Sequence, residues 1–235
     1  MSRRALVSGA TGLIGRALLV ELLAARSGTE AGSSPRYDAV HALRRGPPAA
    51  APRGTPADLR LHWHGVSFSA LPAFPHIDDA YIALGTTIKQ AGSQAAFKAV
   101  DLDAVLASAR AAKAAGATRL AVVSALGADA HSSVFYNRVK GEMEAALSAL
   151  GFDSLVIAQP SLLMGDRAAL GQPVRRMENL AATLLRPLLG LVPASVRPID
   201  ATVVARALAG ALQNPAPGVQ RLVSAQLQTL GTPAG

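Results

Sequence analysis

Tyr136 and Lys140 stand four positions apart in a stretch with a helical pattern, after a strand-like run that ends at Ser124. On a helix, positions i and i+4 share one face, so the lysine can lie beside the tyrosine hydroxyl. A phenol near its reference pKa of about 10 is a poor base at neutral pH, and a neighbouring ammonium favours its ionised form. The spacing therefore predicts that Tyr136 gives or takes a proton with help from Lys140. The Ser124 hydroxyl is suited to orient a substrate oxygen.

Three glycines near the amino end, Gly9, Gly12 and Gly15, separate an apolar run from a helix-like run. Backbone N–H groups and the positive end of a helix dipole at such a turn can meet an anionic pyrophosphate. Gly9 permits the tight turn, Gly12 a close backbone approach, and Gly15 tight packing of the helix on the strand. A plain strand–turn–helix without a ligand is the alternative. The flanking patterns favour a dinucleotide site.

The second strand-like run ends in Arg44 and Arg45, with no acid nearby on its carboxyl side. An acid at this place grips the ribose 2′-hydroxyl of NAD, whereas an arginine neutralises the 2′-phosphate of NADP. Guanidinium groups match phosphate geometry well. The sequence thus favours NADP(H) over NAD(H), the alternative being two solvated loop arginines.

Strand and helix patterns alternate along the chain, which predicts an α/β, doubly wound Rossmann fold with a parallel sheet covered on both faces. Ligands gather at the carboxyl ends of the strands in such folds. We expect strands over 5–8, 38–43, 59–63, 80–84, 120–124, 155–158 and 221–224, and helices over 13–25, 93–115, 134–150, 174–189 and 201–213. The residues expected to bind the cofactor are Gly9, Thr11, Gly12, Leu13, Ile14, Gly15, Arg44, Arg45, Leu84, Gly85, Thr86, Ser124, Tyr136, Lys140 and Pro160.

The length of 235 residues suits one domain, residues 1–235, in which residues 161–200 form a small substrate lobe. That segment could equally be a helix pair closing the domain or a surface between copies, so a homo-oligomer stays open.

The formal net charge of +8 raises the question of a nucleic-acid partner, but aromatic residues make up only 4% of the chain. Basic runs do not exceed two residues, and few aromatic platforms are available for stacking, so we expect a small-molecule substrate and no nucleic acid. The chain has no cysteine, and the alternating pair His62 and His64 is typical of a solvated strand face, so no metal is expected. We expect no membrane span and a cytoplasmic protein.

Five segments together resemble the short-chain dehydrogenase/reductases, and the resemblance runs from residue 3 to about residue 215. It is strongest to the atypical NAD(P)-binding branch close to the Tat-interacting-protein (CC3) oxidoreductases and to the epimerase/dehydratase relatives. The segments are the 9–15 turn, Ala83-Leu84-Gly85-Thr86-Thr87, Val123-Ser124-Ala125-Leu126-Gly127-Ala128-Asp129, Tyr136–Lys140 and Gln159-Pro160. The resemblance implies a Rossmann fold, NADP(H) binding, a catalytic set of Ser124, Tyr136 and Lys140, and a nicotinamide bordered by the backbone after Pro160.

Three positions depart from the pattern of that family. Asp101 stands where many members carry asparagine, and Ala125 stands where many carry a second serine or threonine. The usual acid near the adenine is either replaced by Ser67 or absent. The sequence therefore predicts an NADP(H)-dependent oxidoreductase acting on an unidentified carbonyl or alcohol. A non-catalytic NADP(H)-binding sensor or scaffold is the alternative.

Overall fold

The computed structural model describes residues 3–24, 36–47, 52, 55–164, 193 and 196–232. A seven-stranded sheet with the order β3-β2-β1-β4-β5-β6-β9 forms its centre, and all neighbouring strands are parallel. The strands are β1 (Arg4–Ser8), β2 (Ala39–Arg45), β3 (Leu61–Val66), β4 (Asp79–Ile82), β5 (Arg119–Val123), β6 (Ser154–Gln159) and β9 (Gly218–Val223). The predicted parallel sheet and Rossmann fold are confirmed.

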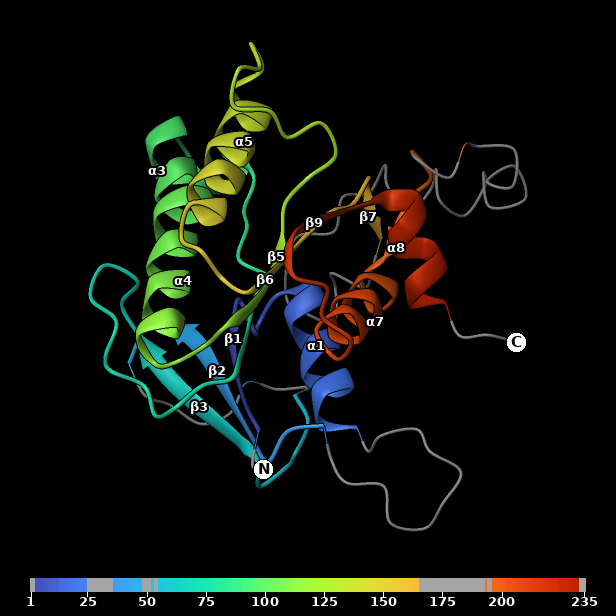
Figure 1. Ribbon diagram of the computed structural model, residues 1–235. Coiled ribbons are helices and arrows are strands. Elements are labelled where there is room, and N and C mark those ends of the chain that lie inside the picture. Colours follow the sequence, from blue (N-terminus) through green and yellow to red (C-terminus); the bar gives the residue numbers. More distant parts are fainter. Residues whose placement is uncertain are drawn as a thin grey trace.

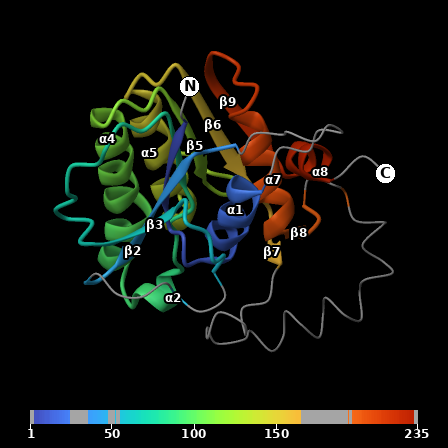
Figure 2. The ribbon, with the colours of Figure 1, turned by 90° about the horizontal axis from the view of Figure 1, so that it is seen from below.

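Helices cover both faces of the sheet, as Figure 1 shows, and the turned view of Figure 2 keeps the two layers on opposite sides. One layer holds α3 (Gln94–Lys98), η1 (Ala99–Ala104), α4 (Val105–Ala114) and α5 (Phe135–Ser148), and the other holds α1 (Leu13–Leu23), α7 (Ala201–Ala211) and α8 (Ser224–Gly231). Side chains alternate along each strand, so Ala5 and Val7 enter the core under α1 and α7 while Leu6 enters the core under α4. Strands buried on both faces explain the continuous apolar runs in the sequence.

The helix expected over 93–115 is divided by a π-helical segment. Ser93 caps its start by accepting the Ala96 N–H, and Gly116, at φ +101°, ends it. Between α3 and α4, the wider turn of η1 buries Asp101. Such π turns are rare and are found frequently at functional sites. A short helix α2 (Ile88–Ala91) precedes this layer and was not expected.

The carboxyl-terminal part departs from expectation in its boundaries. The strand expected over 221–224 is β9, which starts earlier at Gly218, and Ser224 begins α8 instead of ending the strand. Two short strands, β7 (Leu163–Met164) and β8 (Ile199–Asp200), pair with each other outside the main sheet. The helix expected over 174–189 and most of the proposed lobe, 161–200, lie outside the described residues. Within the described ranges, we find no helix with both the length and the apolar character needed to cross a lipid bilayer.

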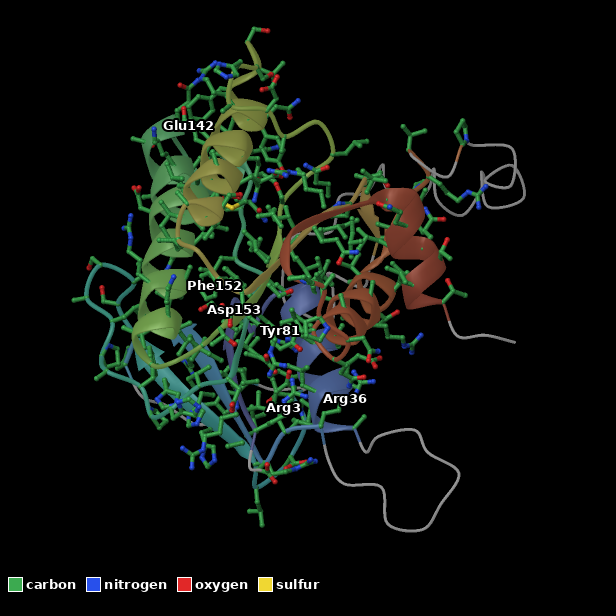
Figure 3. The ribbon with its side chains drawn as sticks, viewed as in Figure 1. Arg3, Arg36, Tyr81, Glu142, Phe152 and Asp153 are labelled. Carbon is green, nitrogen blue, oxygen red and sulfur yellow. The ribbon has the colours of Figure 1, made fainter. Side chains whose placement is uncertain are left out.

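A buried ionic cluster holds the amino-terminal edge of the sheet. Asp79 is fully buried and pairs with both Arg3 and Arg119 at 2.5 Å. The Tyr37 hydroxyl donates to the same carboxylate at 2.5 Å and lies 2.9 Å from the Tyr81 hydroxyl. Figure 3 shows Arg3 beside the lower part of α1 and Tyr81 above it. Burial of the carboxylate is tolerated because two guanidinium groups and a tyrosine hydroxyl lie against it.

Three histidines meet where β2 lies beside the edge strand β3. His41 Nδ1 and His64 Nε2 are 2.9 Å apart, and the ring of His62 stacks on His41 with centroids 5.2 Å apart. Burial, with the neighbouring imidazoles and Arg4, lowers the pKa of His41 to about 4. His62 is exposed as expected, whereas His64 is half-buried. In the part of the chain that the structure describes, no three ligating side chains are arranged to hold a metal ion.

Candidate functional site

A cleft runs along the carboxyl edge of the sheet, beside the point where β1 and β4 lie next to each other. It consists of two adjoining cavities of about 340 and 490 Å³. Gly12, residues 83–86 and Gln90 line both of them, so they form one continuous groove. Crossovers leave β1 and β4 toward opposite faces of the sheet, and this topology opens a crevice at the switch point.

The glycine turn at one side of the cleft is held by close backbone contacts. Gly9 has φ +80°, and a Cβ there would lie 2.5 Å from the Ala83 carbonyl carbon. A Cβ on Gly15 would lie 2.0 Å from the Gly9 carbonyl oxygen, so helix α1 packs on the turn only with glycine at that position. At Gly12 a Cβ would meet no protein atom closer than 3.4 Å. Packing within the protein therefore requires glycine at positions 9 and 15 but leaves position 12 unexplained.

The amino end of α1 faces the cleft without a side-chain cap. Its N-cap residue is Gly12, which has no side chain to accept the first N–H groups of the helix. Thr11, Gly12, Leu13 and Ile14 all line the groove. The orphan N–H groups and the positive end of the helix dipole thus lie beside an open cavity, an arrangement that suits an anion.

The two arginines at the end of β2 differ in their relation to the groove. Arg45 is exposed and lines the smaller cavity together with Thr11 and Gln90. Arg44 is half-buried and is not among the residues that line either cavity. Because side chains alternate along a strand, only one of two consecutive residues faces a given side.

Helix α5 brings Tyr136 and Lys140 to the larger cavity, as their spacing predicts. Lys140 is 3% exposed, and its Nζ lies 2.7 Å from Asp101 Oδ1 on η1. The other Asp101 oxygen accepts the Thr86 N–H at 2.9 Å. The ring of Phe97 packs against Tyr136 with centroids 5.4 Å apart.

The charge environment of Tyr136 differs from the expectation. The sequence suggested that Lys140 lowers the pKa of the phenol, but burial and the Asp101 carboxylate raise the pKa of Tyr136 to about 12. Burial is the larger cause and the Asp101 carboxylate adds to it, while the Lys140 ammonium, which would stabilise a phenolate, is paired with that carboxylate. Spacing along α5 revealed Lys140 but not its partner on another helix.

Ser124 lies at the end of β5 and donates its hydroxyl to Glu144 Oε1 at 2.6 Å. Both side chains are 4% exposed. Gln159 Nε2 donates to Oε1 of the same carboxylate at 2.9 Å, and Arg221 Nε donates to Oε2 at 3.1 Å. With its proton directed at Glu144, the Ser124 hydroxyl offers lone pairs to any further partner. Ala125, which also lines the cavity, adds no second hydroxyl.

Most of the predicted site residues come together in this groove. Those that line it are Gly9, Thr11, Gly12, Leu13, Ile14, Arg45, Leu84, Gly85, Thr86, Ser124, Tyr136, Lys140 and Pro160. Gly15 supports the turn from beneath, and Arg44 lies apart. The sequence reasoning missed Glu144, because its burial depends on donors from other elements of the fold. It also missed Gln90, for which we find no sequence signal.

Comparison with known proteins gives both relatives and structural neighbours. HTATIP2 from Rattus norvegicus is 39% identical over 155 residues, which are 65% of this chain and 60% of that protein, so the match spans less than two thirds of HTATIP2. FMP52 from Eremothecium gossypii, a mitochondrial protein by name, is 36% identical over 165 residues, 69% of this chain and 67% of that one. The structure of MoeE5 in complex with UDP-glucose and NAD has a TM-score of 0.62 at 18% identity, covering 93% of this chain and 75% of that chain, and supports the fold alone. No protein-family model matches the chain.

These relatives correct one expectation from the sequence. The chain was expected to be cytoplasmic, but several of the FMP52 proteins it resembles are named as mitochondrial. The expectation was wrong because it took the lack of a recognisable targeting or membrane segment as evidence for one compartment.

Proposed function

The chain belongs to the atypical short-chain dehydrogenase/reductase family of the HTATIP2 and FMP52 proteins, and from this premise we propose that it is an NADP(H)-dependent oxidoreductase. Its substrate would be a carbonyl compound or the corresponding alcohol. One observation carries the proposal: a single groove joins the uncapped end of α1 to Tyr136 and Lys140 on α5. An anion-binding turn and a proton-exchanging phenol are the two parts that this chemistry needs.

The residues of the groove fit a dinucleotide. Gly12 supports this fit, because an open position free of packing constraint leaves room for a phosphate close to the backbone. The N–H groups of residues 11–14 would hold the diphosphate, and Arg45 would hold a 2′-phosphate at the far end of the smaller cavity. Lys140 and the backbone at Pro160 would border the nicotinamide and its ribose.

In the proposed reaction the cofactor carries the hydride, and side chains of the groove handle the proton and position the substrate. When bound, the nicotinamide supplies or accepts a hydride. Tyr136 holds or releases the proton at the substrate oxygen, and Lys140 binds the ribose and orients it. Because the Ser124 hydroxyl donates its proton to Glu144, its oxygen can position a substrate hydroxyl by accepting a hydrogen bond from it.

A panel of aldehydes, ketones and quinones tests this proposal, with NADPH oxidation followed by absorbance. Tyr136→Phe is expected to lose turnover by about 100-fold or more while it keeps its affinity for NADPH. Tyr81→Phe is the matched control, because it removes a phenol hydroxyl at the opposite edge of the sheet. Equal turnover in wild type and Tyr136→Phe would contradict the catalytic role.

A non-catalytic NADP(H) sensor or scaffold is the second candidate, and the hydrogen bond from the Ser124 hydroxyl to Glu144 favours it. This hydroxyl already serves Glu144, and Ala125 cannot replace it. Tight binding of NADPH without turnover of any carbonyl in the panel would support the sensor and not the enzyme.

A further inference from the structure

The buried carboxylate of Glu144 bears on which chemical group the cleft accepts next to Ser124. We infer that Glu144 is a positioning residue that fixes the Ser124 hydroxyl as a hydrogen-bond acceptor toward the cleft, and that the cleft therefore selects ligands with a hydroxyl at this point over ligands with a carbonyl oxygen. This inference rests on the proposed oxidoreductase function, and it adds to that function a positioning residue and a ligand class.

Three donors from three segments of the chain converge on the Glu144 carboxylate. Ser124, directly after β5, lies 2.6 Å from Oε1, Gln159 Nε2 at the end of β6 lies 2.9 Å from Oε1, and Arg221 Nε on β9 lies 3.1 Å from Oε2. A guanidinium N–H can only donate a hydrogen bond, and a carboxylate can only accept one. Glu144 is therefore the acceptor in all three bonds, and the single hydroxyl proton of Ser124 is directed at it.

Distance and burial keep this proton in place. A separation of 2.6 Å is in the range of hydrogen bonds from a hydroxyl to a carboxylate, which are stronger than bonds between neutral groups. Both residues are 4% exposed, so water hardly competes for the bond, and the Ser124 N–H is itself bonded to the Ala158 carbonyl at 2.7 Å. Turning the hydroxyl toward the cavity would remove a donor from a buried carboxylate, which is costly.

The Ser124 hydroxyl consequently offers the larger cavity its lone pairs. Ser124 lines this cavity together with Tyr136 and Lys140. Among the residues that the structure describes, Glu144 is the hydrogen-bond partner of this hydroxyl. A ligand hydroxyl can donate to the free lone pairs, whereas a carbonyl oxygen would bring its own lone pairs against them and gain no bond. The difference concerns how tightly the two forms of a substrate bind, and it leaves the equilibrium of the reaction unchanged.

Neutron diffraction on a deuterated crystal of the cofactor-free protein locates the Ser124 proton directly. We expect the deuteron between Ser124 Oγ and Glu144 Oε1. A deuteron directed into the cavity would overturn the inference.

Two unreactive probes test the selectivity on the complex with NADP⁺. Cumyl alcohol is a tertiary alcohol whose carbinol carbon has no hydride to give, and acetophenone cannot be reduced by the oxidised cofactor. In ligand-observed NMR titrations, wild type should bind the alcohol about fivefold more tightly than the ketone, which is the effect of one net hydrogen bond. Ser124→Ala should lose this preference by weakening the binding of the alcohol alone. Equal binding, tighter binding of the ketone, or no binding of either probe by wild type would overturn the inference.

Substitution of Glu144 tests its role as the positioning residue. Glu144→Met removes the acceptor and frees the Ser124 proton to turn toward the cavity, so the preference should shift toward acetophenone. Glu142→Met is the matched control, because Glu142 lies on the same helix but pairs with Lys98 of α3 at 2.9 Å (Figure 3), and it should keep the preference of wild type. A folded Glu144→Met that still prefers the alcohol would refute the role of Glu144. If the loss of the buried carboxylate prevents folding, the neutron map and Ser124→Ala still decide the inference.

Failure of the inference and failure of the proposed function give different results. A protein that binds neither NADP⁺ nor NADPH in calorimetry would refute the proposed function, and the neutron map would still decide whether Glu144 holds the Ser124 proton. Normal NADPH binding and carbonyl turnover, combined with acetophenone bound as tightly as cumyl alcohol, would refute the inference alone.

Discussion

His41 makes the stability of this protein depend on pH in a range where most carboxylates are still ionised. Its pKa in the folded chain is about 4, against 6.5 for an unperturbed histidine. Between these two values the unfolded chain binds a proton that the folded chain does not. Stability is therefore complete above about pH 6.5 and is lost as the pH falls toward 4. The difference of about 2.5 units corresponds to at most about 3 kcal/mol.

Urea unfolding followed by circular dichroism at pH 7, 6, 5 and 4.5 measures this loss in wild type and in His41→Asn. Asparagine keeps a donor close to the position of Nδ1, so it can still bond His64 Nε2, but it does not titrate. We expect the free energy of unfolding of the variant to depend less on pH by up to about 2.4 kcal/mol over this range. His131→Asn, at an exposed position, is the control and should follow wild type. Parallel curves for His41→Asn and wild type would refute the reasoning.

Three further changes test the groove and its supports. Arg45→Ala should weaken NADPH binding by about 10-fold or more in calorimetry and leave NADH binding nearly unchanged. Arg44→Ala should produce a smaller difference between the two cofactors. Equal losses of affinity for NADPH and NADH in Arg45→Ala would remove the NADP assignment. Gly15→Ala places a Cβ 2.0 Å from the Gly9 carbonyl oxygen and should lower the free energy of unfolding by about 3 kcal/mol or more in a thermal unfolding assay. Gly210→Ala in α7 is the control, because its Cβ meets nothing within 4 Å, and it should be neutral or stabilising in the same assay. Asp79→Ala leaves Arg3 and Arg119 without their common partner and should lower stability by about 3–5 kcal/mol, and a loss below about 1 kcal/mol would contradict the role of the cluster.

The fold was largely predictable because its signals are local. Apolar runs of strand length alternating with helical patterns are sufficient to predict a doubly wound parallel sheet. The errors lie where pairing or packing overrides the pattern. The strand expected over 59–63 is β3, Leu61–Val66, because its register is set by pairing of Leu61 with Val40. Leu59, whose apolar side chain suggested the earlier start, is 99% exposed in the turn before it.

The candidate site was predictable where chemistry follows spacing along one element. The pair Tyr136 and Lys140 lies on one helical face, and Gly9 and Gly15 take backbone positions that only glycine allows. Contacts between elements were not predictable. Glu144 looks like an ordinary exposed residue of an amphipathic helix, but it is buried because β5, β6 and β9 each direct a donor at it.

One face of α5 therefore carries three charged or ionisable groups that serve different purposes. Tyr136 meets the cavity, Lys140 is held by a carboxylate from η1, and Glu144 holds the hydroxyl at the end of β5. The charges of Lys140 and Glu144 are buried, and their burial is tolerated because each has a partner on another element. The packing of α5 against η1 and against the segment after β5 therefore determines where these three side chains lie relative to the groove.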